Sequence, residues 1–435
     1  MTSGLANGGG AGAGKVSLRL QYYVVLAGVA VVVVVACLKY TPAAAVAAVG
    51  YGFWGGGGPQ HQQGAAASGV AVAGSAAVAA AAATTTTSPG SSAPARSPVV
   101  IFNFGDSNSD TGGMAAAMGL NIALPEGRTY FRRPTGRLSD GRLVIDFICE
   151  SLNTPHLSPY MKALGSDFSN GVNFAIGGST ATPGGSSFSL DVQLHQFLFF
   201  RTRSIELINQ GVRTPIDRDG FRNAIYTIDI GQNDLSAYLH LPYDQVLAKI
   251  PPIVAHIKYA IEALYGHGAR KFWVHGTGAL GCLPQKLAIP RDDDSDLDGN
   301  GCLKTYNDVA RSFNVQLAAA CRQLRQRMAD AAVVFTDMRA IKYDLVANHT
   351  RYGIETPLMA CCGHGGPPYN YNHFKMCMSA EMELCDTDAK FASWDGVHYT
   401  EAANAVVAAK VLTGEYSTPP VRIASLVNST IANDG

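Results

Sequence analysis

Five short runs of continuous apolar residues recur along the chain from residue 99 onward, and a helix-like pattern follows each of them. Continuous apolar character, without strict alternation of polar positions, is typical of parallel strands that are buried on both faces. Such strand–helix alternation predicts an α/β fold, a three-layer α/β/α sandwich with a central, mainly parallel five-stranded sheet. The runs cover residues 99–104, 172–176, 224–230, 271–275 and 332–336. Amphipathic patterns predict helices over residues 243–265 and 306–329.

Polar clusters that contain glycine follow three of these strands. They read Gly-Asp-Ser-Asn-Ser-Asp at residues 105–110, Gly-Gly-Ser at 177–179 and Gly-Gln-Asn-Asp at 231–234. A fourth cluster, Asp-Gly-Val-His at residues 395–398, comes just before a helix-like stretch at 400–412. Because ligand chemistry gathers at the carboxyl ends of parallel strands, we expect these clusters to meet at one edge of the sheet.

Ser107 is the candidate nucleophile, because it stands where a buried strand passes into a loop. A serine hydroxyl attacks well only when a neighbouring base takes its proton. His398 is the candidate base, since Asp395 lies three residues earlier and is placed to orient its imidazole and stabilise its charge. The sequence therefore predicts a Ser107–His398–Asp395 triad.

Attack by such a serine creates an oxyanion, which needs hydrogen-bond donors already in position. The candidate donors are the backbone N–H groups of Ser107 and Gly177 and the side-chain amide of Asn233. A glycine at 177 lets the backbone approach a substrate without a clash. Each cluster taken alone also fits a structural turn, and Asp-x-x-His alone fits a helix cap. The combination of all four clusters, in order, favours catalysis.

The four clusters resemble the characteristic blocks of the GDSL esterase/lipase family, also called SGNH hydrolases. The resemblance covers residues 99–411 and is greatest to the plant branch. It includes Gly-Arg-Leu-Ser-Asp-Gly at 136–141, Gly-Ala-Leu-Gly-Cys-Leu-Pro at 278–284 and Cys-Cys-Gly-His-Gly-Gly at 361–366. One departure is Gly-Gly at residues 112–113, where the family more often has Gly-Asn.

The resemblance implies an SGNH-like fold and hydrolysis of carboxylic esters through an acyl-serine intermediate, without a cofactor. It makes Ser107 both the nucleophile and the first oxyanion donor. It makes Gly177 and Asn233 the other donors, and His398 and Asp395 the remaining triad residues.

Neighbouring enzyme classes fit the sequence less well. An α/β-hydrolase needs Gly-x-Ser-x-Gly, but Ser109 occupies the second glycine position. A clustered His/Asp ligand set for a metal-dependent deacetylase is absent, and no metal site is expected. Within the acidic loop at 292–298, the carboxylates of Asp294, Asp296 and Asp298, followed by Gly299, resemble the start of a calcium loop. Counted from Asp294, however, the twelfth position is Thr305, which supplies no bidentate carboxylate, so a solvated loop is favoured. His364 is expected to be structural.

The charge balance and the cysteine content indicate which partners and which cellular compartment fit the chain. The 33 basic and 33 acidic side chains balance, and no basic block suggests nucleic acid as a partner. An even set of cysteines after residue 148 permits disulfides, including Cys282 with Cys302, in an oxidising compartment. Their connectivity stays open, and Cys149 and Cys321 are expected to be buried free thiols. The sequons at Asn348 and Asn428 are candidate glycosylation sites.

The N-terminal region predicts a membrane anchor. Residues 22–38 form an uncharged, mostly apolar run that is just long enough to cross a bilayer as a helix. Positive charge precedes it at residues 1–21, which favours a cytoplasmic N-terminus and a type II orientation. A cleaved signal peptide is the alternative. Residues 39–96 have the low-complexity composition of a disordered stem, followed by a folded domain at 97–415 and a C-terminal tail at 416–435.

This layout resembles that of Golgi glycan-processing enzymes. The leading functional hypothesis is removal of O-acetyl groups from a cell-wall polysaccharide such as xylan, by a lumenal, membrane-anchored esterase in the Golgi. One alternative is a secreted lipase or esterase that acts on fatty-acyl esters. A second, from another class, is a catalytically silent glycan-binding wall protein. The sequence leaves acyl length, sugar position and oligomeric state open.

Overall fold

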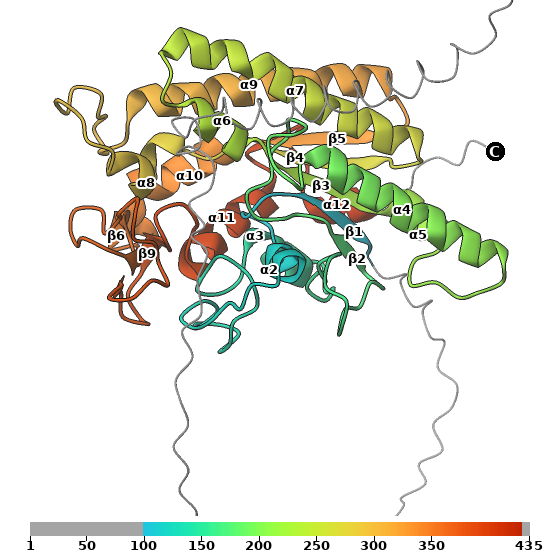
Figure 1. Cartoon of the computed structure of the whole chain (residues 1–435). Helices are drawn as coiled ribbons and strands as arrows, with labels where there is room; N and C mark the ends of the chain where they lie inside the picture. The colour runs from blue at the N-terminus through green and yellow to red at the C-terminus, as the bar shows by residue number, and fades with distance from the viewer. Residues whose placement is uncertain (1–98, 429–435) are drawn as a thin grey trace, which may run out of the picture. The chain divides into compact units, whose positions relative to one another are not determined.

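A six-stranded sheet forms the centre of the computed structural model, which describes residues 99–428 (Figure 1). The strand order is β10-β5-β4-β3-β1-β2, with β10 antiparallel to β5 and the other pairs parallel. The bounds are β1 Ile101–Gly105, β2 Gly171–Asn173, β3 Ile225–Asp229, β4 Lys271–His275, β5 Ala332–Thr336 and β10 Ser417–Thr418. All five predicted parallel strands are confirmed, and β10 is a sixth strand that the sequence did not predict.

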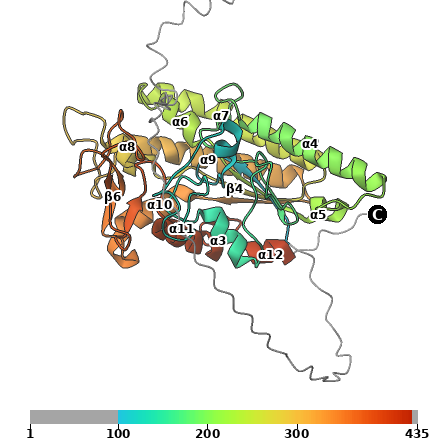
Figure 2. The ribbon, with the colours of Figure 1, turned by 60° about the horizontal axis from the view of Figure 1, so that its bottom comes forward.

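Helices cover both faces of the sheet, as Figures 1 and 2 show. One layer holds α4 Leu190–Asn209, α7 Tyr243–Gly266 and α9 Lys304–Arg327, packed on a core that includes Phe102, Phe104 and Phe272. The opposite layer packs on Ile101 and Trp273. It holds α3 Val144–Ser151, α10 Met338–Ala347, α11 Glu401–Thr413 and α12 Ile423–Asn428. Successive strand residues point to opposite faces, which gives each helix layer its own apolar core.

Shorter elements complete the fold, most of them around the carboxyl end of the sheet (Figure 1). The helices are α2 Gly113–Met118, α5 Arg218–Asn223, α6 Gln232–Tyr238 and α8 Pro284–Leu287, with 3-10 turns η2 Leu280–Cys282 and η3 His349–Tyr352. The strands are β6 Thr356–Ala360, β7 Cys362–Gly363, β8 Glu383–Leu384 and β9 Phe391–Ser393. β6 pairs with β9 and β7 pairs with β8, and these two small sheets carry the chain towards residues 395–398. The predicted helices at 243–265, 306–329 and 400–412 correspond to α7, α9 and α11.

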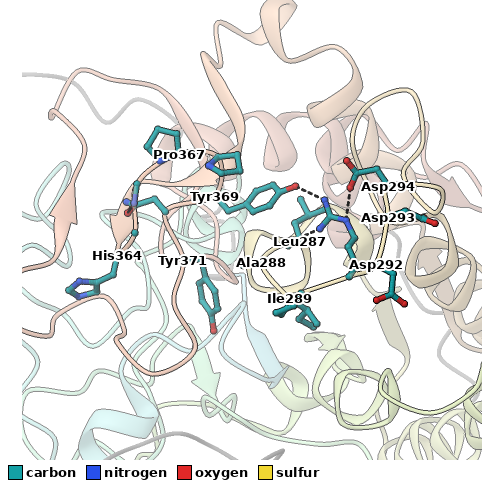
Figure 3. A pocket seen from close by; sticks show the side chains of 16 residues that line it. Leu287, Ala288, Ile289, Asp292, Asp293, Asp294, His364, Pro367, Tyr369 and Tyr371 are labelled. Atoms are coloured by element: carbon teal, nitrogen blue, oxygen red, sulfur yellow. Dashed lines mark hydrogen bonds and ion pairs between the residues drawn. The ribbon is translucent and has the colours of Figure 1, made fainter.

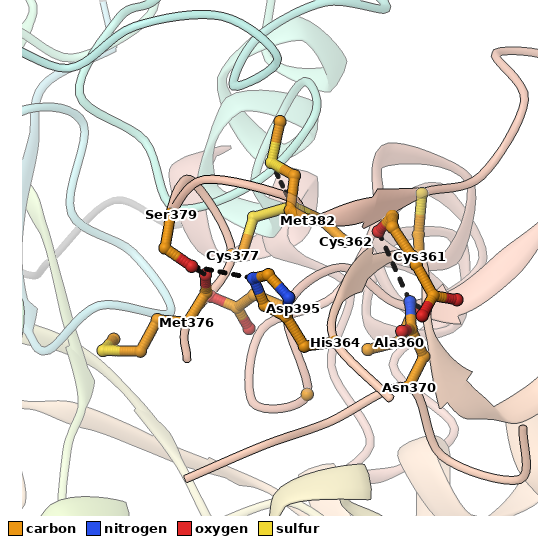
Figure 4. The surroundings of a disulfide bond; sticks show 12 residues. Ala360, Cys361, Cys362, His364, Asn370, Met376, Cys377, Ser379, Met382 and Asp395 are labelled. Atoms are coloured by element: carbon orange, nitrogen blue, oxygen red, sulfur yellow. Dashed lines mark hydrogen bonds between the residues drawn. A yellow bond between two sulfur atoms is a disulfide. The ribbon is translucent and has the colours of Figure 1, made fainter. Parts of the chain in front are cut away.

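Three disulfides fasten the loops near that end. Cys282 and Cys302 are bonded, as the sequence permitted, and Cys149 and Cys321 are buried free thiols, as expected. The other two bonds join Cys361 to Cys385 and Cys362 to Cys377. Figure 4 shows the surroundings of the second, where His364 Nε2 lies 2.7 Å from Ser379 Oγ. This partly buried hydrogen bond is consistent with the structural role expected of His364.

The folded domain extends beyond residue 415, where the sequence predicted a tail. Ser417 and Thr418 pair with the edge of β5, and Leu426 of α12 is buried in the core. The short, polar β10 has no apolar pattern of its own, which is why the sequence pattern places the boundary too early. The C-terminal residues are therefore part of the sheet and of one helix layer as far as residue 428.

The predicted anchor at 22–38 and stem at 39–96 lie outside the described residues. Within residues 99–428, no helix combines the length and apolar character that crossing a bilayer requires. Of the two candidate glycosylation sites, Asn348 is exposed at the C-terminal end of α10. Asn428 is exposed at the last residue of α12.

Candidate active site

The loop after β1 presents Ser107 at the carboxyl edge of the sheet. A tight turn forms directly after the strand, because Asp106 accepts hydrogen bonds from the backbone N–H groups of Ser109 (3.1 Å) and Asn108 (2.9 Å). Strand order 2-1-3-4-5 places a topological switch point between β1 and β3, the location where open α/β sheets bind ligands. Ser107 itself is buried, and within residues 99–428 neither its hydroxyl nor its backbone N–H makes a hydrogen bond.

His398 and Asp395 lie in the loop between β9 and α11 and form a close pair. His398 Nδ1 lies 2.6 Å from Asp395 Oδ2, and Asp395 Oδ1 accepts the backbone N–H groups of Val397 (2.9 Å) and His398 (2.8 Å). This geometry makes Nδ1 the donor, so Nε2 is the nitrogen that is available to accept a proton. Nε2 is buried and has no hydrogen-bond partner in the described part of the chain. The Asp-x-x-His spacing thus produces an oriented imidazole.

The electrostatics of the pair suit a general base. Burial alone lowers the pKa of His398, but the charge and hydrogen bond of Asp395 outweigh it, and the pKa is raised above 6.5. Burial alone raises the pKa of Asp395, but the charge and hydrogen bonds of His398 outweigh that effect, and the pKa is lowered. Asp395 is therefore ionised while it holds His398. No hydrogen bond joins His398 Nε2 to Ser107 Oγ among the described residues, and such bonds commonly tighten only when substrate binds.

In the second cluster, the two glycines differ in whether the backbone N–H is engaged in a hydrogen bond, and the free one is not the one that the sequence predicted as an oxyanion donor. The Gly177 N–H donates to Asp110 Oδ2 at 2.8 Å, and that carboxylate also accepts the N–H groups at the start of α2. The Gly177 N–H is therefore already occupied. The next residue, Gly178, has φ of +79° and nothing within 4 Å of where a Cβ would lie. Its N–H makes no hydrogen bond within residues 99–428.

Asn233 lies on the first turn of α6, directly after β3. Its Nδ2 donates to the Ser179 carbonyl at 2.9 Å and faces Asp106 Oδ2 at 3.4 Å. The neighbouring Asp234 accepts the backbone N–H groups of Ala181 (2.7 Å) and Thr182 (2.9 Å). The Gly-Gln-Asn-Asp cluster thus holds the 177–182 loop beside the nucleophile turn, and these hydrogen bonds bring three of the four predicted clusters together.

The motif at residues 136–141 contacts the residues that follow His398 and so helps to position its loop. Ser139 Oγ donates to the Tyr399 carbonyl at 3.0 Å, and Asp140 Oδ1 accepts the N–H of Glu401 at 2.7 Å, at the start of α11. Arg137 forms a fully buried, bidentate ion pair with Asp146 at 2.6 and 2.8 Å. This motif therefore holds in place the loop that carries His398.

A set of charged side chains beside the nucleophile turn, two of them buried and one half-buried, was not predicted. It consists of Asp106, Asp229 at the end of β3 and Lys342 on α10, whose Nζ lies 3.3 Å from Asn108 Oδ1. Burial and repulsion from Asp229 raise the pKa of Asp106 to about 7. Burial lowers the pKa of Lys342, and the two carboxylates partly offset that effect. A lone lysine on an amphipathic helix gives no sequence signal of this kind.

The acidic loop at 292–298 uses its inner carboxylates to hold itself together. Asp296 accepts the hydroxyl of Thr305 at 2.8 Å, and Asp298 accepts the hydroxyl of Tyr343 at 2.7 Å. Within residues 99–428, no group of three or more His, Cys, Asp or Glu side chains is arranged to hold a metal ion. The carboxylates of Asp296 and Asp298 therefore act as structural acceptors.

Comparison with known proteins gives the family. The model of the GDSL-like Lipase/Acylhydrolase family matches residues 101–411. The chain belongs to the GDSL esterase/lipase family. It is a carboxylic ester hydrolase by that membership, as the four clusters predicted. A GDSL esterase/lipase of Arabidopsis thaliana is 54% identical over 331 residues, covering 74% of this chain and 88% of that protein.

Two further relatives lie at lower identity. The GDSL esterase/lipase LIP-4 of Arabidopsis thaliana is 50% identical and covers 76% of this chain and 90% of its own length. A protein named alpha-L-fucosidase 3, from the same plant, is 41% identical and covers 72% of this chain and 90% of its own length. The aligned portions cover about three quarters of this chain and nearly the whole of each relative.

Proposed function

We propose that Ser107 is the nucleophile of this GDSL esterase/lipase, that His398 is its general base and that Asp395 orients the base. The observation that carries this proposal is the 2.6 Å contact of His398 Nδ1 with Asp395, together with a buried Nε2 on the same ring that has no partner within residues 99–428. A base with one nitrogen held by an ionised carboxylate and the other free is the arrangement that activates a serine hydroxyl.

In the proposed reaction, His398 Nε2 takes the Ser107 proton as Oγ attacks the ester carbonyl carbon. The tetrahedral intermediate then collapses, and the imidazolium gives that proton to the departing alcohol, which leaves an acyl-serine. Water, deprotonated by His398, attacks the acyl-serine, and the returning proton restores Ser107. The carboxylic acid departs, and no cofactor takes part.

The oxyanion donors of this proposal are the N–H groups of Ser107 and Gly178 and the side-chain amide of Asn233. Gly178 replaces the predicted Gly177, because the Gly177 N–H is engaged by Asp110. An oxyanion needs donors that are available before the reaction, and within residues 99–428 the N–H groups of Ser107 and Gly178 make no hydrogen bond. The Asn233 amide has two hydrogens: one is donated to the Ser179 carbonyl at 2.9 Å, and the other, on the long 3.4 Å contact with Asp106, is the one assigned to the oxyanion.

For the substrate, we propose an O-acetyl group on a cell-wall polysaccharide such as xylan, removed in the Golgi lumen. Three features support it: the anchor-like run at residues 22–38, the stem-like composition of residues 39–96, and a relative, 41% identical, whose name refers to a sugar. The competing substrate is a fatty-acyl ester met after secretion.

The test is acetate release by the full-length chain from a panel of acetylated polysaccharides. Acetate release from acetylated xylan that disappears in Ser107→Ala supports both the nucleophile and the substrate. Strong hydrolysis of long-chain acyl esters without acetate release favours the fatty-acyl alternative. A chain that a fluorophosphonate probe leaves unlabelled, and that hydrolyses no ester, is the silent glycan-binding protein.

A further inference from the structure

An open groove lies beside the candidate active site, between residues 287–294 and residues 364–371 (Figure 3). Its volume is about 520 Å³. Figure 3 shows Tyr369 and Tyr371 on one side, Asp292 and Asp294 on the other, and Leu287 and Ile289 between them. The hydrolytic steps described above use none of these side chains.

The groove adjoins the loop that carries the base. The ring of Tyr371 packs on Gly396, so closely that a Cβ at this position would lie 2.3 Å from the ring. On α8, the Gln285 N–H donates to the Gly396 carbonyl at 3.0 Å, and Gln285 Nε2 donates to the Tyr371 hydroxyl at 3.3 Å. One wall of the groove, through Tyr371, and the helix that leads into the other wall, through Gln285, therefore contact the residue that follows Asp395. A glycan whose ester carbonyl is placed at Ser107 extends past this loop when its sugar chain continues into the groove.

The walls are held in place before any ligand binds. Arg291 Nη2 donates to the Tyr369 hydroxyl at 3.1 Å, and its Nε donates to Asp294 at 2.8 Å, so one guanidinium ties the two walls together. Asn370 Nδ2 donates to the Ala360 carbonyl at 3.0 Å, and disulfides at Cys361 and Cys362 hold the base of the loop. Such preorganisation lowers the entropy that a ligand loses on binding.

The chemistry of the lining matches a sugar better than an acyl chain. The flat face of a tyrosine ring packs on the C–H groups of a pyranose, and its hydroxyl exchanges hydrogen bonds with sugar hydroxyls. A carboxylate has two acceptor oxygens and takes paired hydroxyl donors. The Asp292 carboxylate is exposed and has no partner within residues 99–428. An acyl chain would instead need a continuous apolar lining.

The negative charge along one wall of the groove favours neutral sugars over acidic ones. Residues 291–294 comprise one arginine and three aspartates, a formal charge of +1 − 3 = −2. An acidic polymer such as polygalacturonate would bring like charges to this edge, whereas a neutral chain would not. We propose that this groove binds neutral sugar residues next to the esterified sugar, which makes a neutral glycan the substrate class. This inference rests on the proposed function and adds a binding subsite to it.

The first test measures binding apart from catalysis, in the full-length Ser107→Ala chain. Isothermal titration with xylohexaose, a neutral oligosaccharide without esters, should show saturable binding. Adding Tyr369→Ala should weaken it about tenfold, the size expected for one aromatic contact. Asp292→Asn, at an exposed side chain that no described contact uses, should also weaken binding. The matched control is Tyr259→Ala on α7, whose side chain is 63% exposed, and it should leave binding unchanged.

The second test compares kinetics on acetylated xylo-oligosaccharides and on 4-nitrophenyl acetate. In Tyr369→Ala, the ratio of kcat/KM for the oligosaccharide to kcat/KM for the small ester should fall about tenfold. An unchanged ratio in both Tyr369→Ala and Asp292→Asn overturns the subsite, as does equal affinity for hexagalacturonate. If the chain releases no acetate but still binds xylohexaose in a way that depends on Tyr369, the proposed deacetylation is overturned. The subsite would then still be supported.

Discussion

Lys342 Nζ lies 3.3 Å from Asn108 Oδ1, and Asn108 is the residue that follows the candidate nucleophile. The same ammonium group lies 4.4 Å from the ring centre of Tyr399, the residue that follows the candidate base. Lys342 is 5% exposed, so both contacts are shielded from water. One buried side chain on α10 therefore contacts both loops of the candidate triad and fixes their relative position.

Lys342→Met should lower kcat and move the acidic limb of the pH profile to higher pH. The positive charge of Lys342 lowers the pKa of His398, so its loss raises that pKa and protonates the base over a wider range. The measurement is kcat/KM for 4-nitrophenyl acetate against pH, with Lys258→Met on α7 as the control. Lys342→Arg should restore the position of the limb. A profile that stays in place in Lys342→Met would show that the lysine only fills space.

The wild-type profile itself carries a second prediction. His398 acts as a base only when neutral, and Asp395 outweighs burial to raise the pKa of His398 above its ordinary 6.5. Activity should therefore rise with pH and reach half of its plateau above pH 6.5. Asp395→Asn removes the raising charge, so the limb should move to lower pH while kcat drops ~10³–10⁴-fold. If the limb does not move in Asp395→Asn, the pH profile does not report the protonation of His398.

Asn233 should contribute to the oxyanion site through its side-chain amide. Asn233→Ala removes one donor, and the loss of one such donor typically lowers kcat by ~10²–10³-fold with little effect on KM. The amide also holds the Ser179 carbonyl, so the comparison needs a structural control. Ser179→Ala leaves that carbonyl in place and removes only the hydroxyl bond to Phe188 O, and it should retain most of the activity. If Asn233→Ala lowers kcat/KM only by raising KM, the amide binds the substrate in its ground state and does not stabilise the oxyanion.

The buried Arg137–Asp146 pair should be needed for stability more than for chemistry. Arg137→Met leaves the Asp146 carboxylate buried without its partner, which typically destabilises a fold by ~3–5 kcal/mol. Chemical denaturation at pH 7 measures the change in the free energy of unfolding. Replacing both residues, as Arg137→Met with Asp146→Leu, removes the unpaired charge and should recover part of the loss. A double variant no more stable than Arg137→Met would argue against an uncompensated charge as the cause.

Acid should weaken the same pair. Burial raises the pKa of Asp146, but Arg137 outweighs it and the net pKa lies below the ordinary 3.8. The stability that this carboxylate contributes is therefore present above its unfolded-state pKa and is lost as pH falls through the lowered, folded-state value. Denaturation midpoints measured between pH 7 and pH 3 should converge for the wild type and Arg137→Met as Asp146 takes up its proton.

The sequence was most informative where the signal was local. Continuous apolar runs located all five parallel strands, and the Asp395–His398 spacing produced the hydrogen-bonded pair that it predicted. It was least informative where a partner lay far along the chain. The Gly177 N–H is occupied by a carboxylate 67 positions away, and Lys342 contacts a residue 234 positions away. Neither contact can be predicted from the spacing of residues in the sequence. The free N–H of Gly178 and the buried lysine could therefore be identified only from the three-dimensional structure.

The two residues of β10 have a further consequence for the sheet. They occupy the outer edge of β5, and without them that edge would present unpaired N–H and C=O groups to other molecules. A protein truncated after residue 415 would therefore expose a template on which a second chain could add a strand. Strand β10 thus protects the edge of β5 from pairing with a second molecule, and its removal should first appear as oligomers in solution.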